Sequence, residues 1–116
     1  MTDIEIERLG PIARITLNRP ERHNALDPEM INELHGALDE LRADETLRVL
    51  QLAGRGPSFC AGADIGWMRR MADYDPAENR ADAERLAGLF EKLAHLPLPT
   101  IALVNGPAYG GGVGLV

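Results

Sequence analysis

The order of three segments limits how this chain can fold. A segment of alternating apolar and polar residues is followed by an amphipathic segment and then by a short apolar segment. Apolar residues alternate over residues 13–17, which is typical of a strand with one buried face. Asp27-Pro28 then supplies a helix N-cap and a first-turn proline, and apolar residues recur at helical spacing to about Asp44. The apolar run 47–53 is too short for a helix and suits a buried strand. Strand, helix and strand in this order predict a βαβ unit and therefore an α/β fold.

The segments on either side of this unit extend the same architecture. Apolar residues also alternate over residues 2–9, and Gly10-Pro11 separates this segment from residues 13–17. The two segments are therefore expected to form a hairpin. Beyond the unit, residues 67–71 show the spacing of a short helix, and a capped helix is expected from Asp75 to about Leu96. A third strand of the core type is expected over residues 100–105. The glycines after it are interpreted as the turn into another helix.

Composition limits the class of protein. The chain has 116 residues, of which 45% are hydrophobic and 26% charged, so it is expected to be globular and to contain at most one domain, residues 1–116. Because it stops on apolar residues inside the expected last helix, we expect this domain to be incomplete at its C-terminus. The net charge of -6 argues against a nucleic-acid partner. Prolines and glycines in the uncharged stretch 96–116 argue against a membrane helix.

Cysteine usage and the N-terminus suggest a compartment. Cys60 is the single cysteine, so no intramolecular disulfide can form, and between Phe59 and Ala61 it is expected to be a buried filler and not a nucleophile. The acidic, alternating N-terminus fits neither a secretory signal nor a transit peptide. A cytoplasmic protein is therefore expected.

Two segments share a property that could serve catalysis. At residues 61–64 and 110–112, a strand leads into a turn of small residues and then into a helix, whose first N–H groups have no partner within the helix. If both turns face one point, their N–H groups could hold one developing oxyanion, such as that of a thioester enolate. A mobile tail or tight packing would also explain the glycines. Neither the P-loop pattern nor the dinucleotide fingerprint fits their spacing.

Several spaced motifs together resemble the enoyl-CoA hydratase/isomerase (crotonase) family across essentially the whole chain. They are Asn18-Arg19-Pro20 with Asn24-Ala25-Leu26, then residues 59–64, then Asn105-Gly106-Pro107 with the three glycines. The resemblance implies the N-terminal part of the crotonase-type ββα spiral fold. It also implies an acyl-CoA substrate, no cofactor apart from the CoA of the substrate, no metal, and a homo-oligomer, either a trimer or a dimer of trimers.

The resemblance also assigns roles to particular residues. The family's oxyanion donors fall on the backbone N–H groups of Ala63 and Gly111. Its CoA and substrate contacts fall on two loops, and two residues of the following helix are expected to line an acyl pocket; together these are Arg22, His23, Ala25, Ala61, Gly62, Asp64, Ile65, Trp67 and Met68. Some of these have simpler explanations. A loop histidine such as His23 is usually just solvated, and core packing explains Trp67 and Met68 equally well.

One departure from the family concerns acid/base catalysis. Where enoyl-CoA hydratases carry a catalytic glutamate, this chain has Gly114, and the family's second carboxylate would lie beyond Val116. The expected function is hydration of an enoyl-CoA, with an isomerase, a decarboxylase or a non-catalytic CoA-binding fragment as alternatives, and the 116-residue chain alone is expected to be inactive. Residues 67–71, 108–109 and 113–116 look similar to the methylglutaconyl-CoA or isohexenylglutaconyl-CoA hydratase branch.

Overall fold

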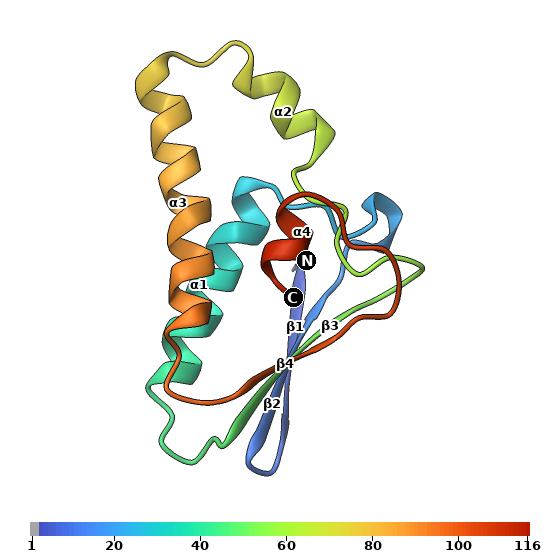
Figure 1. The fold of residues 1–116 in the computed structure, drawn as a ribbon, viewed down its shortest axis with the longest axis vertical. Coiled ribbons are helices and arrows are strands. Elements are labelled where there is room, and N and C mark those ends of the chain that lie inside the picture. The colour runs from blue at the N-terminus through green and yellow to red at the C-terminus, as the bar shows by residue number, and fades with distance from the viewer. Residues whose placement is uncertain (1–2) are drawn as a thin grey trace.

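A four-stranded sheet forms the frame of the molecule (Figure 1). The computed structural model describes residues 3–116, apart from the side-chain surroundings of residues 111 and 113. The strands lie in the order β1 (Ile4–Leu9), β2 (Ile12–Leu17), β3 (Val49–Gly54) and β4 (Thr100–Leu103). β1 pairs antiparallel with β2, and β2, β3 and β4 are parallel to one another. The predicted hairpin and βαβ unit are confirmed, although Thr2, expected in the first strand, lies outside the described residues.

Helices connect the strands. The short 3-10 turn η1 (Pro20–Arg22) leads from β2 to α1 (Pro28–Arg42), which crosses to β3. After β3 come α2 (Ile65–Met71) and α3 (Pro76–Ala94), and α3 runs alongside α1 before the chain enters β4 (Figure 1). The last element is one turn of helix, α4 (Gly111–Gly114). Among the described residues, no helix combines the length and the apolar character needed to cross a lipid bilayer.

Both predicted helix starts are confirmed at the level of hydrogen bonds. The Asp27 carboxylate accepts from the N–H of Met30 at 2.9 Å, and the Asp75 carboxylate accepts from the N–H of Glu78 at 2.8 Å. In each case a proline follows at the first helical position, where its missing N–H is not needed. Each cap satisfies an N–H that the helix leaves without a partner, so these sequences begin helices at these points.

The core lies between the sheet and α1. The alternating residues Ala13, Ile15 and Leu17 of β2 are almost completely buried, and β3 contributes Leu50 and Leu52 to the same layer. Helix α1 faces them with a stripe at helical spacing, consisting of Met30, Ile31, Leu34, Ala37, Leu38 and Leu41. The period of two in the strands and of about 3.6 in the helix therefore place both apolar faces in one core.

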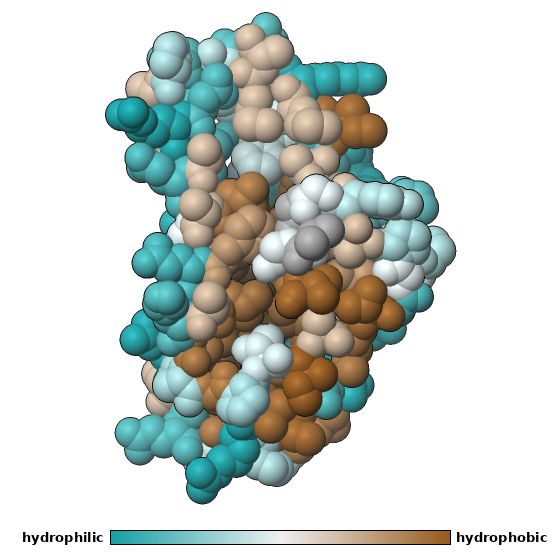
Figure 2. Space-filling view, in the orientation of Figure 1, coloured by the Kyte–Doolittle hydropathy of each residue, from teal (hydrophilic) through white to brown (hydrophobic). Residues whose placement is uncertain are grey.

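β4 differs from the buried strand that was expected. It is an edge strand, and Ile101 and Leu103 are 47% and 40% exposed. In Figure 2 hydrophobic side chains gather on the face that α3, β4 and α4 share. A cavity of about 280 Å³ opens there, lined by residues that include Phe90, Leu93 and Leu115. Apolar side chains identify a strand, but burial needs a covering layer, and the described elements place none over this side of β4.

One buried side chain ties together the loops that leave β2 and β3. The Asn24 side-chain oxygen accepts from the N–H of Arg19 at 2.8 Å. Its amide nitrogen donates to the carbonyl oxygens of Arg55, Ser58 and Phe59 at 2.9, 3.0 and 3.1 Å. Asn24 is fully buried and has a φ of 55°, a conformation that asparagine tolerates better than most residues. This amide therefore holds the two loops against each other.

Replacing Asn24 by alanine should lower the free energy of unfolding by about 2–4 kcal/mol, because it removes the amide and leaves buried carbonyl groups without a donor. Urea unfolding followed by circular dichroism measures this change. Asn79→Ala is the matched control, since Asn79 is exposed on α3 and its loss should cost no more than about 0.5 kcal/mol. Equal losses for the two variants would contradict a structural role for Asn24.

Candidate active site

Two short parallel pairings bring three loop segments together at the ends of the parallel strands. The N–H of Leu26 donates to the carbonyl of Gly62 at 2.6 Å, and the N–H of Asp64 donates to the carbonyl of Leu26 at 2.7 Å. On the other side, Cys60 pairs with Ala108, and its carbonyl accepts from the N–H of Tyr109 at 3.0 Å. Segments 24–27, 58–64 and 105–112, which are far apart in the sequence, are thereby held side by side.

The first of these pairings does not include hydrogen bonds to the backbone N–H or carbonyl group of Ala63. Leu26 bonds to the residues before and after Ala63, so the N–H and carbonyl of Ala63 point away from Leu26. Among the residues that the structure describes, no acceptor lies within hydrogen-bonding distance of this N–H. Ala63 is half-buried and lines a cavity. The predicted donor is therefore a free N–H group at the wall of that cavity.

The glycine cluster packs closely against the same loop. A Cβ atom at Gly112 would lie 2.3 Å from the carbonyl oxygen of Cys60, and one at Gly110 would lie 4.0 Å from the Cα of Gly62. Gly110 also has a φ of +51°, which favours glycine. Tight packing therefore explains Gly112, and the left-handed backbone conformation explains Gly110. Gly111 is the first residue of α4, a position whose N–H has no partner within a helix.

The cavity beside Ala63 collects most of the predicted site residues. Its volume is about 330 Å³, and it is lined by Arg22, His23, Ala25, Ala61, Ala63, Asp64, Ile65 and Met68. Ile65 and Met68 are largely exposed at α2, so they add apolar surface to the opening. Gly62 lies buried within the loop that forms the wall. The structure brings together residues from the η1 loop, the loop after β3 and helix α2.

Trp67 lies elsewhere, contrary to the expectation that it lines the substrate pocket. Its side chain is only 2% exposed and belongs to the hydrophobic core. The indole N–H donates to the carboxylate of Asp82 in α3 at 3.0 Å. Consecutive residues of a helix are about 100° apart around its axis, so when Met68 faces the cavity, Trp67 faces α3. Of the two interpretations of Trp67, the structure supports core packing.

Asp64 and Arg22 form an ion pair at the rim of the cavity. The buried Asp64 carboxylate accepts from the N–H of Trp67 at 3.1 Å, which caps α2, and from the guanidinium of Arg22 at 3.1 Å. Burial alone would raise the pKa of Asp64, but the Trp67 N–H and the Arg22 guanidinium outweigh it and lower the pKa below its usual value. Because the guanidinium is half-exposed, its remaining N–H groups are accessible at the rim of the cavity.

His23 is held in place beside this ion pair. Its Nδ1 atom lies 3.0 Å from the hydroxyl oxygen of the buried Ser58, which is within hydrogen-bonding distance. The backbone of His23 contacts the same loop, because its carbonyl accepts from the N–H of Ala61 at 3.0 Å. A freely solvated loop histidine would not need such partners. The imidazole is therefore part of a fixed cavity wall.

The Phe90 ring lies close to position 114. A Cβ atom at Gly114 would lie 2.9 to 3.1 Å from three carbon atoms of that ring. A side chain at this position would therefore require the Phe90 ring to move. Only the packing of α3 against α4 places Phe90 beside Gly114, so the sequence alone does not identify this neighbour. The local spacing of apolar residues in α3 identified its helical face but not its partner.

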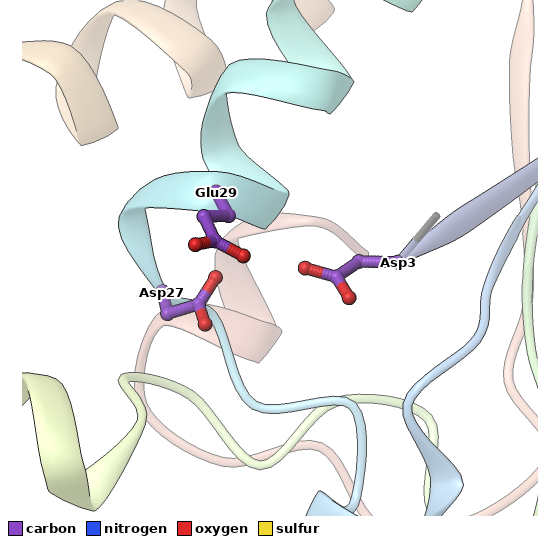
Figure 3. Close-up of side chains that lie close together, drawn as sticks. All are labelled: Asp3, Asp27 and Glu29. Atoms are coloured by element: carbon purple, nitrogen blue, oxygen red, sulfur yellow. The ribbon is translucent and has the colours of Figure 1, made fainter. Parts of the chain in front are cut away.

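A cluster of three carboxylates near the start of α1 is partly neutralised by Arg19. Asp3, Asp27 and Glu29 have carboxylate oxygens within 4.8 Å of one another (Figure 3). The Arg19 guanidinium contacts Asp27 at 2.5 Å and Asp3 at 3.7 Å. Burial raises the pKa of Asp3, while Arg19 opposes this effect and Asp27 and Glu29 add to it. The cluster is therefore a structural ion-pair network that joins the start of β1 to α1.

The fold and the site define the class of protein: an α/β fold of the crotonase type, represented by its N-terminal part, with backbone groups of small residues at the ends of parallel strands. A family model for enoyl-CoA hydratase/isomerase matches residues 7–116, and the chain belongs to this family.

Relatives agree with this assignment. A protein of Thermus thermophilus that is named for enoyl-CoA hydratase is 44% identical over 112 residues, which are 97% of this chain and 44% of that protein. The mitochondrial enoyl-CoA hydratase domain-containing protein 2 of Mus musculus is 41% identical over 119 residues, covering 97% of this chain and 39% of that protein. A crystal structure of an enoyl-CoA hydratase from Shewanella pealeana superposes with a TM-score of 0.94 at 41% identity, covering 97% and 43%. The chain thus spans less than half the length of these relatives.

Gly112→Ala should destabilise the protein by about 1–3 kcal/mol, because the added methyl group meets a backbone carbonyl that cannot move aside easily. Gly36→Ala is the control. Nothing lies within 4 Å of a Cβ atom at Gly36, which is exposed within α1, so alanine there should stabilise the helix by about 0.5–1 kcal/mol. Urea unfolding of both variants measures these changes. A stabilising effect at both positions would contradict the close contact of the glycine turn with Cys60.

The Cys60 thiol should react slowly with a thiol reagent such as dithiobisnitrobenzoate. Burial raises the pKa of Cys60, so less thiolate is present at about pH 8 than for a solvated cysteine. The native protein should therefore react at least about tenfold more slowly than protein in denaturant. Absorbance of the released thionitrobenzoate follows the reaction. Equal rates in the two states would show that the segment 58–64 opens readily.

Proposed function

We propose that the protein to which this chain belongs acts on acyl-CoA thioesters, and that the backbone N–H groups of Ala63 and Gly111 together bind the thioester oxygen. The observation that carries the proposal is the free N–H of Ala63, which the Leu26 pairing directs away from its neighbouring segment and toward a cavity. Membership of the enoyl-CoA hydratase/isomerase family supports the same function.

Such donors act on charge that develops during the reaction. When a proton leaves the carbon next to the thioester, or a nucleophile adds to the β-carbon of an enoyl group, negative charge moves onto the carbonyl oxygen. A fixed N–H aimed at this oxygen stabilises the transition state more than the substrate, and each such donor contributes roughly 3–4 kcal/mol. Small residues are needed at the turn because a side chain would block the approach of the thioester. In this mechanism the protein needs no resident cofactor.

The cavity beside Ala63 is the proposed place for CoA. Its apolar wall of Ala25, Ala61, Ile65 and Met68 suits the pantetheine arm, and Arg22 at the rim suits a phosphate. His23, fixed by Ser58, is positioned to contact the same ligand. The positive charge is held locally, as an anionic ligand of a chain with net charge -6 requires.

Hydration of an enoyl-CoA is the first candidate reaction, in agreement with the names of the relatives. The absence of a carboxylate at Gly114 favours a second candidate, an isomerase or a decarboxylase of the same family. Hydration needs a base to activate water, and position 114 has no side chain and lies beside the Phe90 ring. A non-catalytic CoA-binding role is the third. A trimer or a dimer of trimers, the methylglutaconyl-CoA or isohexenylglutaconyl-CoA branch, and inactivity of the chain alone stay predictions.

Gly111→Pro in the active full-length protein should lower kcat by about 100-fold to 1000-fold, because proline removes one of the two proposed donors. Proline is well tolerated at the first position of a helix, so the fold should survive. Binding of CoA itself, measured by isothermal titration calorimetry, should change by less than about threefold, since free CoA has no thioester oxygen. Circular dichroism serves as the control for folding.

Two results would count against the oxyanion role. Equal losses of turnover and CoA affinity would assign Gly111 to binding or folding alone. Unchanged turnover would exclude its N–H from the transition state. A panel of enoyl-CoA and carboxyacyl-CoA thioesters, with products separated by chromatography, distinguishes hydration from isomerisation and decarboxylation.

A further inference from the structure

Helix α2 supplies part of the wall of the cavity beside Ala63, because Ile65 and Met68 line that cavity. The structure describes every residue of α2, and among them Trp67 alone is buried. Met71, which lies one turn later on the same side of the helix, is only half-buried. The rotation of a short helix about its axis depends on the side chains that it buries. The orientation of Ile65 and Met68 therefore depends on what holds Trp67.

A hydrogen bond from α3 holds the Trp67 indole, whose N–H donates to the carboxylate of Asp82 at 3.0 Å. A cavity of about 90 Å³ lies beside the ring, lined by residues that include Pro28 and Ile31 of α1 and Arg85 of α3. Packing on that side is therefore incomplete and leaves the ring room to turn. The hydrogen bond selects one orientation, because a buried indole N–H that turned away from Asp82 would lose its acceptor.

Asp82 belongs to a part of α3 that α1 holds in place. The Nε2 atom of the buried His35 in α1 donates to the carbonyl oxygen of Arg85 at 2.8 Å, since a carbonyl can only accept. The Arg85 guanidinium donates in turn to the side-chain oxygen of Asn32 in α1. Residues 76–81, which precede Asp82 in α3, are all exposed, and Figure 1 shows α3 extending past α1 toward α2. These contacts form a continuous connection from α1 through α3 to α2.

We propose that Asp82 is a positioning residue for the CoA cavity, although it is not among the residues that line this cavity. Through the Trp67 indole it fixes the rotation of α2, so that Ile65 and Met68 face the ligand. Trp67 and Met68 are consecutive in the helix, so a rotation that moves the indole moves Met68 by the same angle. This inference rests on the proposed function, because the part of the ligand that meets these two apolar side chains is the pantetheine arm.

The polar rim of the cavity is held by contacts other than that of Asp82. Arg22 and His23 belong to the loop around η1, where Asp64 binds Arg22 and Ser58 lies within hydrogen-bonding distance of His23. A contact that only stabilises the fold would, when lost, weaken every ligand of the cavity or none. A positioning contact of Asp82 should instead affect the pantetheine arm and spare the phosphate groups that meet the η1 loop.

Isothermal titration calorimetry on the full-length protein compares CoA with adenosine bisphosphate, the nucleotide portion of CoA that lacks the pantetheine arm. Asp82→Leu should weaken CoA binding about tenfold, the factor that one lost hydrogen bond commonly represents, and change nucleotide binding by less than about twofold. Glu84→Leu is the matched control, since it also replaces a carboxylate of α3 by leucine but at an exposed position. It should change the binding of either ligand by less than about twofold.

Two further variants separate positioning from folding. Asp82→Asn keeps a side-chain oxygen that can accept from the indole, so its CoA affinity should stay within about twofold of that of the unaltered protein. Trp67→Phe removes the donor and keeps an aromatic ring, so it should weaken CoA binding as Asp82→Leu does. Because both changes remove the same hydrogen bond, combining them should weaken binding by no more than about twofold beyond either one.

Fluorine NMR of protein labelled with fluorotryptophan observes the indole itself. The Trp67 signal is identified by its loss in Trp67→Phe. It should shift in Asp82→Leu, because the ring loses its acceptor, and it should stay near its original position in Asp82→Asn and in Glu84→Leu.

The outcomes distinguish this inference from the function on which it rests. CoA binding that Asp82→Leu leaves unchanged would overturn the positioning role alone. So would equal weakening of CoA and the nucleotide, a loss of affinity in Asp82→Asn as large as in Asp82→Leu, or a Trp67 signal that Asp82→Leu does not move. Failure of the unaltered protein to bind CoA would overturn the proposed function and this inference with it.

Discussion

The parallel pairing of Leu26 with Ala63 is the interaction on which the rest of the site depends. It joins the loop after β2 to the loop after β3, and the amide of Asn24 strengthens the same connection through three carbonyl groups. Asn105, in the segment 105–112, makes similar contacts, because its side chain donates to the carbonyl groups of Gly56 and Ser58. These hydrogen bonds are made to backbone carbonyl groups. They therefore hold the segment 58–64 in place although many of its side chains are too small to do so by packing.

A site that is built from backbone groups requires neighbouring segments to approach the backbone closely. The turn at residues 110–112 must approach the carbonyl of Cys60 more closely than a Cβ atom allows, which accounts for glycine there. The Phe90 ring also lies beside Gly114, so a side chain there would require that ring to move. The described residues thus contain a backbone N–H group without a partner, at Ala63, and a cavity beside it. Under the proposed function, the choice between hydration and the other reactions of thioester enolates depends on where a carboxylate is supplied.

The two outer strands of the sheet differ in character. β1 carries two glutamates and α1 adds two more beside them, so like charges oppose pairing of β1 with a copy of itself. β4 carries exposed isoleucine and leucine beside the apolar surface of α3 and α4. One side of the sheet is therefore acidic, and the other is apolar.

The sequence by itself determined the elements, the helix caps and the family, because these depend on local periodicity, on residues such as Asp27 and Asp75, and on motifs of fixed spacing. It also determined the candidate site residues, eight of which line one cavity. Only the tertiary structure decided that Trp67 faces α3, that β4 is an exposed edge and that Phe90 lies beside Gly114. Each of these depends on which distant segment lies opposite a residue, and contacts between distant segments leave no periodic signal in the sequence.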